Sequence, residues 1–256
     1  MWKEIGFEPV VIYVGKPDAW TGGCQTVAGE TCEDLFILSS LIEPIEGYDD
    51  GTIAQAARLI GSSLPVHDDD YILTTDVDLL PIQRAYFEQA DMSKPIHLFF
   101  SNAYGQHNGP HYPICHIGAN RIVWNQLVGC EGRPTPWALI SKIMADLPPN
   151  SPHPAAWNFD EEWISRKISS SPLFGQAQHI SRGFNPYGFA RGRIDRGQLH
   201  ELNPPIGEAI DCHAWRPGYS LENWPKIREI FKHVVPEGLE WADIYHRKFA
   251  SKIENL

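Results

Sequence analysis

Short apolar runs alternate along this chain with longer segments in which the apolar residues follow helical spacing. Runs of about four to eight aliphatic and aromatic residues, bounded by Gly, Pro or acidic residues, are typical of buried strands. We expect strands of this kind at residues 9–15, 35–38, 70–81 and 95–100. The alternation of such strands with helices predicts an α/β fold.

The helical spacing is clearest between the second and third of these strands. From Ile53 to Leu64 apolar residues recur every three or four positions, which places one apolar stripe on a helix. Asp50 or Thr52 is expected to cap this helix at its N-terminus. Arg58 lies off the stripe, and we expect it on a solvated face or, if the helix packs beside the acidic strand described next, at a phosphate. Further helices are expected at residues 82–90, 119–128, 136–147, 223–235 and 240–253, with the end of a helix at residues 2–7.

The apolar run at residues 70–81 ends in two carboxylates one residue apart. Because side chains alternate along a strand, Asp76 and Asp78 would point to the same side and Val77 to the other, before Pro81 ends the pairing. Open α/β sheets bind ligands at such strand ends. Carboxylate oxygens suit Mg²⁺ or Mn²⁺, which in turn bind phosphate oxygens. The run therefore predicts a metal-bridged nucleotide site, and the plain structural alternative is a solvated turn after a core strand.

The composition bounds the number of domains and the classes of partner. A chain of 256 residues is long enough for one large α/β domain with a substantial core. Its formal charge of -11, from 21 Lys and Arg against 32 Asp and Glu, argues against general nucleic-acid binding. The residues that could form a local basic patch, either as a solvated loop or as a contact to a phosphate or an acidic sugar, are Arg182, Arg191, Arg193 and Arg196.

The cysteines and the apolar runs bear on the compartment. The five cysteines are odd in number and show no Cys-x-x-Cys spacing, which argues against a structural zinc site or a disulfide framework. We expect Cys24 and Cys32, which lie near each other in the sequence, to remain unpaired. No run approaches the roughly 18 apolar residues of a membrane helix, and Met1–Glu4 does not begin a signal peptide. We therefore expect a protein of the reducing cytoplasm without a membrane span.

The loop expected at residues 101–118 gathers polar side chains among Gly and Pro. It carries Asn102, His107, His111 and His116, and such loops hold acceptor or ligand contacts in many α/β enzymes. Clustered histidines can also bind zinc. Because these histidines are spaced along an irregular loop and not on one helix face, the contact role is favoured over a zinc site.

Three acidic residues, 160–162, open a predicted helix. The helix dipole favours acids at this position, and that effect alone would explain them. The functional interpretation is that Asp160 is a general base held in a cleft. Trp157, Phe159 and Trp163 would then form an apolar wall that packs against a sugar face.

Two motifs together resemble the GT-A class of nucleotide-sugar glycosyltransferases with an Asp-x-Asp motif. One is the Gln-Ala-Ala-Arg helix at residues 55–58 that leads into the acidic run at 70–81, and the other is the late Asp-Cys-His at 211–213. The resemblance implies a single Rossmann-like domain with a mixed, mostly parallel sheet flanked by helices. Its parts would be a donor and metal half near residues 1–100, an acceptor and catalytic half near 101–220, and terminal helices at 221–256.

The resemblance also implies roles for individual residues. Asp78 and His213 would be direct ligands of a Mn²⁺ or Mg²⁺ ion bound to the donor diphosphate. Asp76 would contact the same ion, through a water molecule or directly, or the donor ribose. Arg58 would lie near the diphosphate or the base.

The donor base and the acceptor side are implied in the same way. This class opens with a strand whose following loop binds the nucleotide base. Here either the sequence begins after that element, or residues 11–34, including Val14 and Gly15, take its role for a UDP-sugar, the favoured donor. The segment around Asp160 looks like the one that supplies the base in inverting members, with Glu161 as the second choice. The implied reaction is transfer of a sugar to a hydroxyl of a carbohydrate acceptor, with inversion. More loosely, the layout is similar to virus-encoded transferases that build glycans.

Two other classes of function fit the same residues. A nucleotidyltransferase or a metal-dependent phosphohydrolase would use Asp76 and Asp78 with the same ion and would yield a nucleotide product without a sugar acceptor. A non-catalytic sugar-binding module would instead stack sugars on Trp157, Trp163 and Trp215, and its binding would not depend on metal.

Overall fold

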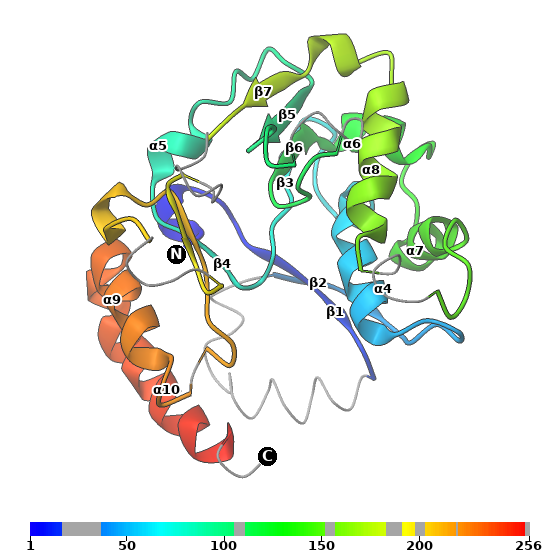
Figure 1. Ribbon diagram of the computed structural model, residues 1–256. Coiled ribbons are helices and arrows are strands. Elements are labelled where there is room, and N and C mark those ends of the chain that lie inside the picture. Colours follow the sequence, from blue (N-terminus) through cyan, green and yellow to red (C-terminus); the bar gives the residue numbers. More distant parts are fainter. Residues whose placement is uncertain are drawn as a thin grey trace.

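The computed structural model describes residues 1–16, 37–104, 111–151, 157–182, 191–197, 203–218 and 220–253. Most of the expected base-binding segment at 11–34, His107, and both Cys24 and Cys32 lie outside these ranges. Within them the chain has the mixed α/β character that was predicted, with helices gathered on two sides of three small sheets (Figure 1).

The described strands pair into three sheets. Parallel and antiparallel pairings are equal in number among them. The described strands therefore do not form the one mostly parallel sheet that was predicted. In sheet order they are β1 (Val10–Val14) and β2 (Ile37–Ile42); β3 (Tyr71–Leu73), β6 (Ile117–Asn120), β5 (Ile96–Phe99) and β7 (Gln178–Ile180); and β4 (Leu79–Pro81), β9 (Asp211–His213) and β8 (Arg193–Asp195).

The described helices fall where the apolar periodicity predicted them, with shifted ends. They are α4 (Asp50–Ala57), α5 (Arg84–Phe87), α6 (Arg121–Val128), α7 (Pro136–Met144), α8 (Phe159–Ser170), α9 (Trp224–Val234) and α10 (Leu239–Ile253). Short 3₁₀ turns accompany them: η1 (Lys3–Ile5), η3 (Arg58–Ser63), η4 (Phe174–Gln176), η6 (Ile206–Glu208) and η7 (Pro236–Gly238).

Helix α4 is capped by Asp49, so the predicted caps, Asp50 and Thr52, are wrong and lie inside the first turn. The carboxylate of Asp49 accepts a hydrogen bond from the Gly51 amide at 2.8 Å and so caps the helix. The predicted stripe from Ile53 to Leu64 is buried throughout, although the α-helix ends after two turns and the chain continues as the tighter η3. Because η3 begins at Arg58, this arginine is carried along the same buried segment.

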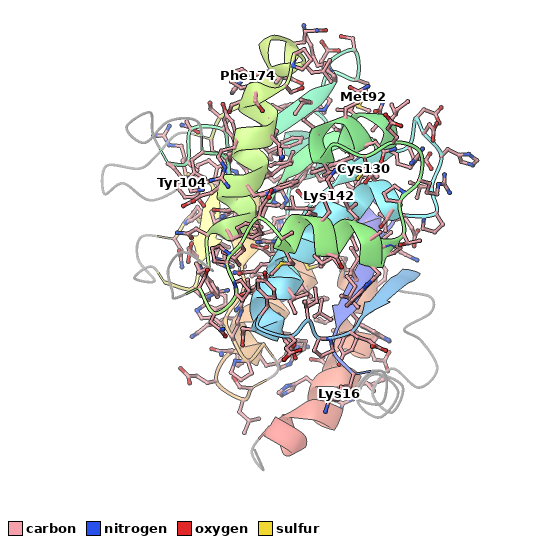
Figure 2. All side chains as sticks on the ribbon, turned by 90° about the vertical axis from the view of Figure 1, so that its right-hand side faces the viewer. Lys16, Met92, Tyr104, Cys130, Lys142 and Phe174 are labelled. Carbon is pink, nitrogen blue, oxygen red and sulfur yellow. The ribbon has the colours of Figure 1, made fainter. Side chains whose placement is uncertain are left out.

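Two main cores hold the sheets in place. In the larger, α4, η3, α6, α7 and α8 pack against β5 and β6 around Trp124 and Trp163, both fully buried. Figure 2 looks onto these helices, with Lys142 marking α7. In the smaller, α9 and α10 cover β4, β8 and β9 around Trp224. Since hydrophobic burial is the main favourable term in folding, these cores position the short strands that carry the candidate site.

The predicted acidic strand is in fact two short strands of different sheets. The first, β3, ends at Leu73. The amide of Thr74, the next residue, donates to the Ile117 carbonyl at 3.0 Å, and its hydroxyl oxygen accepts from the Ile117 amide at 3.0 Å. Asp76 and Asp78 lie in the connection between β3 and β4, and Val77 between them is 94% exposed. The two carboxylates therefore stand where the chain passes from one sheet to another, and not at the end of a single strand.

The described cysteines are free, and two of them are buried. Burial raises the pKa of Cys115, and it raises the pKa of Cys212 to about 12. Because the thiolate is the reactive form, neither thiol is a nucleophile at neutral pH. Within the described ranges no helix combines the length and the apolar character that crossing a bilayer demands.

Candidate functional site

Backbone pairing in the three-stranded sheet brings three distant parts of the chain together. Strand β9 lies between β4 and β8, and His213 is opposite both Leu79 of β4 and Asp195 of β8. Asp78 comes directly before β4, and its carbonyl accepts a hydrogen bond from the Ala214 amide at 2.8 Å. The register thus sets Asp78, His213 and Asp195 side by side.

Asp76, Asp78 and His213 converge in the way that the sequence motifs implied. One ligand atom from each lies within 4.8 Å of the other two, and all three side chains are partly exposed. Two carboxylates and one imidazole are ligands that Mn²⁺ and other first-row divalent ions accept. This cluster is therefore a candidate metal site within the described part of the chain.

The carboxylate of Asp78 is surrounded by cations. Its Oδ2 atom accepts from Arg196 Nη1 and from Arg216 Nε at 2.7 Å, and His213 Nε2 lies 3.4 Å away. Its Oδ1 atom is buried and has no hydrogen-bond partner among the described residues. Burial alone would raise the pKa of Asp78, but the hydrogen bonds from His213, Arg216 and Arg196 outweigh it and hold the pKa far below its usual range.

The imidazole of His213 lies between two carboxylates. Its Nε2 faces Asp78, and its Nδ1 is 3.8 Å from Asp195 Oδ2. Hydrogen bonds to Asp195 and Asp78 raise the pKa of His213 above its usual range, against the smaller opposing effect of partial burial. To bind a metal ion, His213 would have to lose the proton that these carboxylates favour, and Asp195 beside its second nitrogen would then keep the ring oriented.

Arg58 joins the metal candidates to the proposed base. Its Nη1 donates to Asp76 and its Nη2 to Asp160, while its Nε donates to the Gln55 carbonyl at 3.2 Å. Of the two expectations for Arg58, the structure therefore places it beside the acidic connection and not on a solvated face. The Asp160 side chain is 1% exposed, and its Oδ1 has no hydrogen-bond partner among the described residues.

Glu161, the second choice for the base, is engaged elsewhere. Its Oε2 accepts from the hydroxyl of Tyr104 at 2.9 Å, and its Oε1 accepts from the Ile114 amide at 3.2 Å. His111 Nε2 is 3.4 Å from the same carboxylate. Tyr104, at the left in Figure 2, belongs to the segment that enters the predicted polar loop. Glu161 thus anchors that loop to α8.

The predicted aromatic wall is wrong for two of its three members. Phe159 and Trp163 are buried in the larger core, and Trp163 Nε1 donates to Asp146 at 2.7 Å. Trp157, just before α8, is 54% exposed. Trp215 is half-buried under the ammonium group of Lys226. Of the three tryptophans expected to stack sugars in a binding module, only Trp157 is more than half exposed in the described structure.

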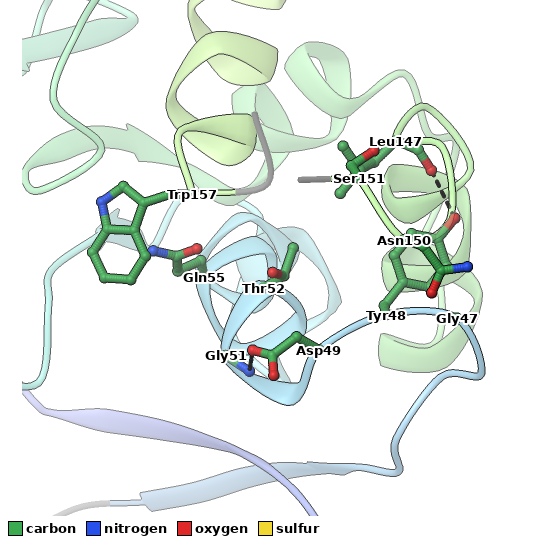
Figure 3. Close-up of a pocket in the computed structure, with 10 residues that line it drawn as sticks. All are labelled: Gly47, Tyr48, Asp49, Gly51, Thr52, Gln55, Leu147, Asn150, Ser151 and Trp157. Atoms are coloured by element: carbon green, nitrogen blue, oxygen red, sulfur yellow. Dashed lines mark hydrogen bonds between the residues drawn. The ribbon is translucent and has the colours of Figure 1, made fainter. Parts of the chain in front are cut away.

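A hollow of about 650 Å³ lies beside the first turn of α4 (Figure 3). In Figure 3 the indole ring of Trp157 and the side-chain amide of Gln55 lie at one side of this hollow. The metal candidates are not part of its wall. The described residues that line it are Gly47, Tyr48, Asp49, Gly51, Thr52, Gln55, Leu147, Asn150, Ser151 and Trp157.

The predicted basic patch is not one surface. Arg182 and Arg193 are buried and both donate two hydrogen bonds to the carboxylate of Asp211, at 2.5 to 2.9 Å. His116 Nε2 lies 3.4 Å from the same carboxylate. Arg196 instead reaches Asp78. Two of the four arginines are therefore structural, because a charge buried without a partner would be costly and each of these has one.

The remaining candidates have contacts away from the metal cluster. Val14 packs against the larger core, and the Gly15 amide donates to the Ile42 carbonyl at 2.9 Å beside β2. Asn102 accepts from the Arg182 amide at 3.4 Å. The assignment of Val14 and Gly15 to a nucleotide base stays a prediction.

Asp195 and Arg216 are site residues that the sequence reasoning missed. Only the pairing of β8 with β9 brings Asp195 to His213, and no local pattern reports that register. Arg216 had a local signal, because it is a cation three positions after the proposed ligand His213.

Comparison with known proteins adds no relative, since no protein-family model, no curated protein and no solved structure matches this chain.

Proposed function

We propose that this protein is a metal-dependent glycosyltransferase built as a single GT-A-like domain. It would transfer a sugar from a nucleoside-diphosphate sugar, with UDP as the favoured nucleotide, to a carbohydrate hydroxyl with inversion at the anomeric carbon. The observation that supports this proposal most is the convergence of Asp76, Asp78 and His213, from distant parts of the sequence, to within 4.8 Å.

The residues present fit a divalent cation. The donor set is two carboxylates and an imidazole, and the buried Oδ1 of Asp78, without a hydrogen-bond partner in the described structure, leaves one carboxylate oxygen for a cation. Asp76, Asp78 and His213 would hold the ion. When bound, Mn²⁺ or Mg²⁺ supplies positive charge to the diphosphate as the bond between sugar and phosphate breaks.

Asp160 is the proposed base for the acceptor hydroxyl. Arg58 holds one of its oxygens, and the other has no hydrogen-bond partner among the described residues. A carboxylate oriented in this way can accept the hydroxyl proton while the acceptor attacks. Arg58 also pairs with Asp76, so it sets the base at a defined position relative to the metal ligands. A single base that activates the attacking hydroxyl corresponds to inversion.

The hollow beside α4 is the proposed place for the acceptor. Gln55 lies one turn before Arg58, and Trp157 lies one turn before Asp160, so the hollow and the ion pair share the same two segments. The exposed ring of Trp157 suits the apolar face of a sugar, and the Gln55 amide and the Asp49 carboxylate suit its hydroxyls.

The first test is calorimetric titration of UDP, and of a panel of UDP-sugars, with and without Mn²⁺. We expect binding that requires Mn²⁺ and that raises the melting temperature of the protein. Asp78→Asn should weaken this binding about 100-fold or more, because it removes a charged metal ligand. Equal, metal-independent binding by the wild-type protein and the variant would instead favour a sugar-binding module.

The second test separates the two neighbouring acids. Asp160→Asn should lower sugar transfer by about 100-fold to 10 000-fold, because it removes the base, while UDP binding in the presence of Mn²⁺ is retained. Glu161→Gln is the matched control, since its carboxylate is already held by Tyr104 and the Ile114 amide, and it should keep most of the activity. Full turnover by Asp160→Asn would remove its role, and nucleotide release that needs no acceptor would favour a phosphohydrolase.

A further inference from the structure

We propose that Arg196 and Arg216 bind the donor diphosphate, and that to do so they leave the carboxylate they hold in the metal-free protein. The inference rests on the proposed function, because it needs a divalent cation at Asp78 and a diphosphate beside it. Its consequence is that the cation and the diphosphate bind together, and that each binds weakly alone.

The contacts of Asp78 are one-sided. Arg196 Nη1, Arg216 Nε and Nη2, and His213 Nε2 all meet the same oxygen, Oδ2, while Oδ1 is buried with no hydrogen-bond partner in the described structure. If the arginines served only to neutralise the carboxylate, hydrogen bonds to both of its oxygens would stabilise it more. Three side chains contact Oδ2 and no described group hydrogen-bonds Oδ1, as expected for a carboxylate whose second oxygen binds a cation.

The two guanidinium groups are placed so that they can turn to a second anion. The side chain of Arg216 is 57% exposed and that of Arg196 is 27% exposed. Water can replace the contacts of these two guanidinium groups, so they can leave Asp78 once a metal ion neutralises its carboxylate. The planar fork of arginine matches phosphate oxygens as well as it matches carboxylates. Both groups can therefore bind a diphosphate once a metal ion has taken over Asp78.

The charges around the cluster are close to balance before any ligand arrives. A divalent cation alone would add positive charge beside three guanidinium groups, and a diphosphate alone would meet carboxylates. Together the two ligands restore the balance, so each should raise the affinity of the other by the same factor. The groups concerned are the carboxylates of Asp76, Asp78, Asp160 and Asp195 and the guanidinium groups of Arg58, Arg196 and Arg216.

The test is calorimetric titration of the full chain with Mn²⁺ alone and with preformed manganese pyrophosphate. In Arg216→Gln a competitor for Asp78 is gone, and so is a contact to the phosphates. We expect the variant to bind Mn²⁺ alone about threefold or more tightly, and manganese pyrophosphate about tenfold or more weakly, than the wild-type protein. A change of opposite sign in the two titrations cannot come from partial unfolding, which would lower both affinities.

Two further variants make the result decisive. Arg196→Gln should shift the two affinities in the same opposite directions. Arg84→Gln is the matched control, because Arg84 is an exposed arginine that pairs with Glu88 outside the cluster, and it should change neither affinity. If Arg216→Gln and Arg196→Gln lower both affinities or change neither, the exchange is wrong while the metal site stands. If the wild-type protein binds Mn²⁺ in neither titration, the proposed function fails and the exchange fails with it.

Discussion

Two aspartates in this protein each form a cluster with two arginines and one histidine. The two clusters have the same composition but differ in burial. In the first, which we term the closed cluster, all the side chains are buried and both carboxylate oxygens accept hydrogen bonds. In the second, the open cluster, the side chains are partly exposed and one oxygen carries all three cations. The closed cluster is Asp211 with Arg182, Arg193 and His116, and the open cluster is Asp78 with Arg196, Arg216 and His213.

Strands β8 and β9 supply residues to both clusters. Asp211 and His213 share one face of β9, and Arg193 and Asp195 stand opposite them on β8. At the Asp211 end, aromatic rings lie against the arginines, including that of Phe100. At the His213 end, solvent reaches the side chains. Alternate residues of the same two strands therefore lie in a buried cluster at one end and in a partly exposed cluster at the other.

The largest expected difference between the clusters is in stability. Asp211→Asn leaves two buried guanidinium groups without a counter-charge and should lower the free energy of unfolding by about 3–5 kcal/mol. Asp78→Asn removes a carboxylate that accepts from two arginines, but these arginines keep contact with water, so the loss should be smaller, about 1–3 kcal/mol. Urea unfolding of both variants at pH 7 measures this, with an unchanged denaturant slope as the control for two-state behaviour. Equal losses in the free energy of unfolding would show that both clusters stabilise the fold to the same extent.

Substituting one arginine in each cluster should give a smaller difference in the free energy of unfolding. Arg193→Gln removes one of two cations from buried Asp211 and should cost about 2–3 kcal/mol, since Arg182 remains. Arg196→Gln, in the open cluster, should change the free energy of unfolding by less than about 1 kcal/mol. The same urea titrations compare the two, and a large loss in Arg196→Gln would contradict the distinction.

The smallest expected difference is in the dependence of stability on pH. Burial lowers the pKa of His116, so below about pH 6.5 the unfolded chain binds more protons at this residue and stability falls with falling pH, by at most about 1.4 kcal/mol per pH unit. His213 acts oppositely, because its raised pKa stabilises the fold at low pH, an effect lost as pH rises through its folded pKa. His116→Gln should therefore flatten the acid side of a stability curve recorded by urea unfolding between pH 5 and 7.5. An unchanged slope would show that His116 is not the group responsible.

Local pattern determined much of the secondary structure and the choice of candidate residues. Apolar spacing from Ile53 to Leu64 reported a buried helix face, because helical periodicity depends only on near neighbours. Residue chemistry singled out Asp76 and Asp78, because carboxylate oxygens bind hard cations, and the resemblance added His213. The candidate ligands were therefore named from the sequence, and their role as ligands stays a prediction.

Tertiary structure decided what each of these residues does. The acidic run divides into two strands because Thr74 bonds into one sheet while the chain after Asp78 pairs with β9 of another. Neighbouring arginines separate in the same way, since Arg193 enters the interior and Arg196 reaches the open cluster. Strand register and exclusion of water depend on contacts between residues far apart in the chain. A sequence pattern along one segment carries neither, which is why it named candidate ligands but could not tell the buried Arg193 from the partly exposed Arg196.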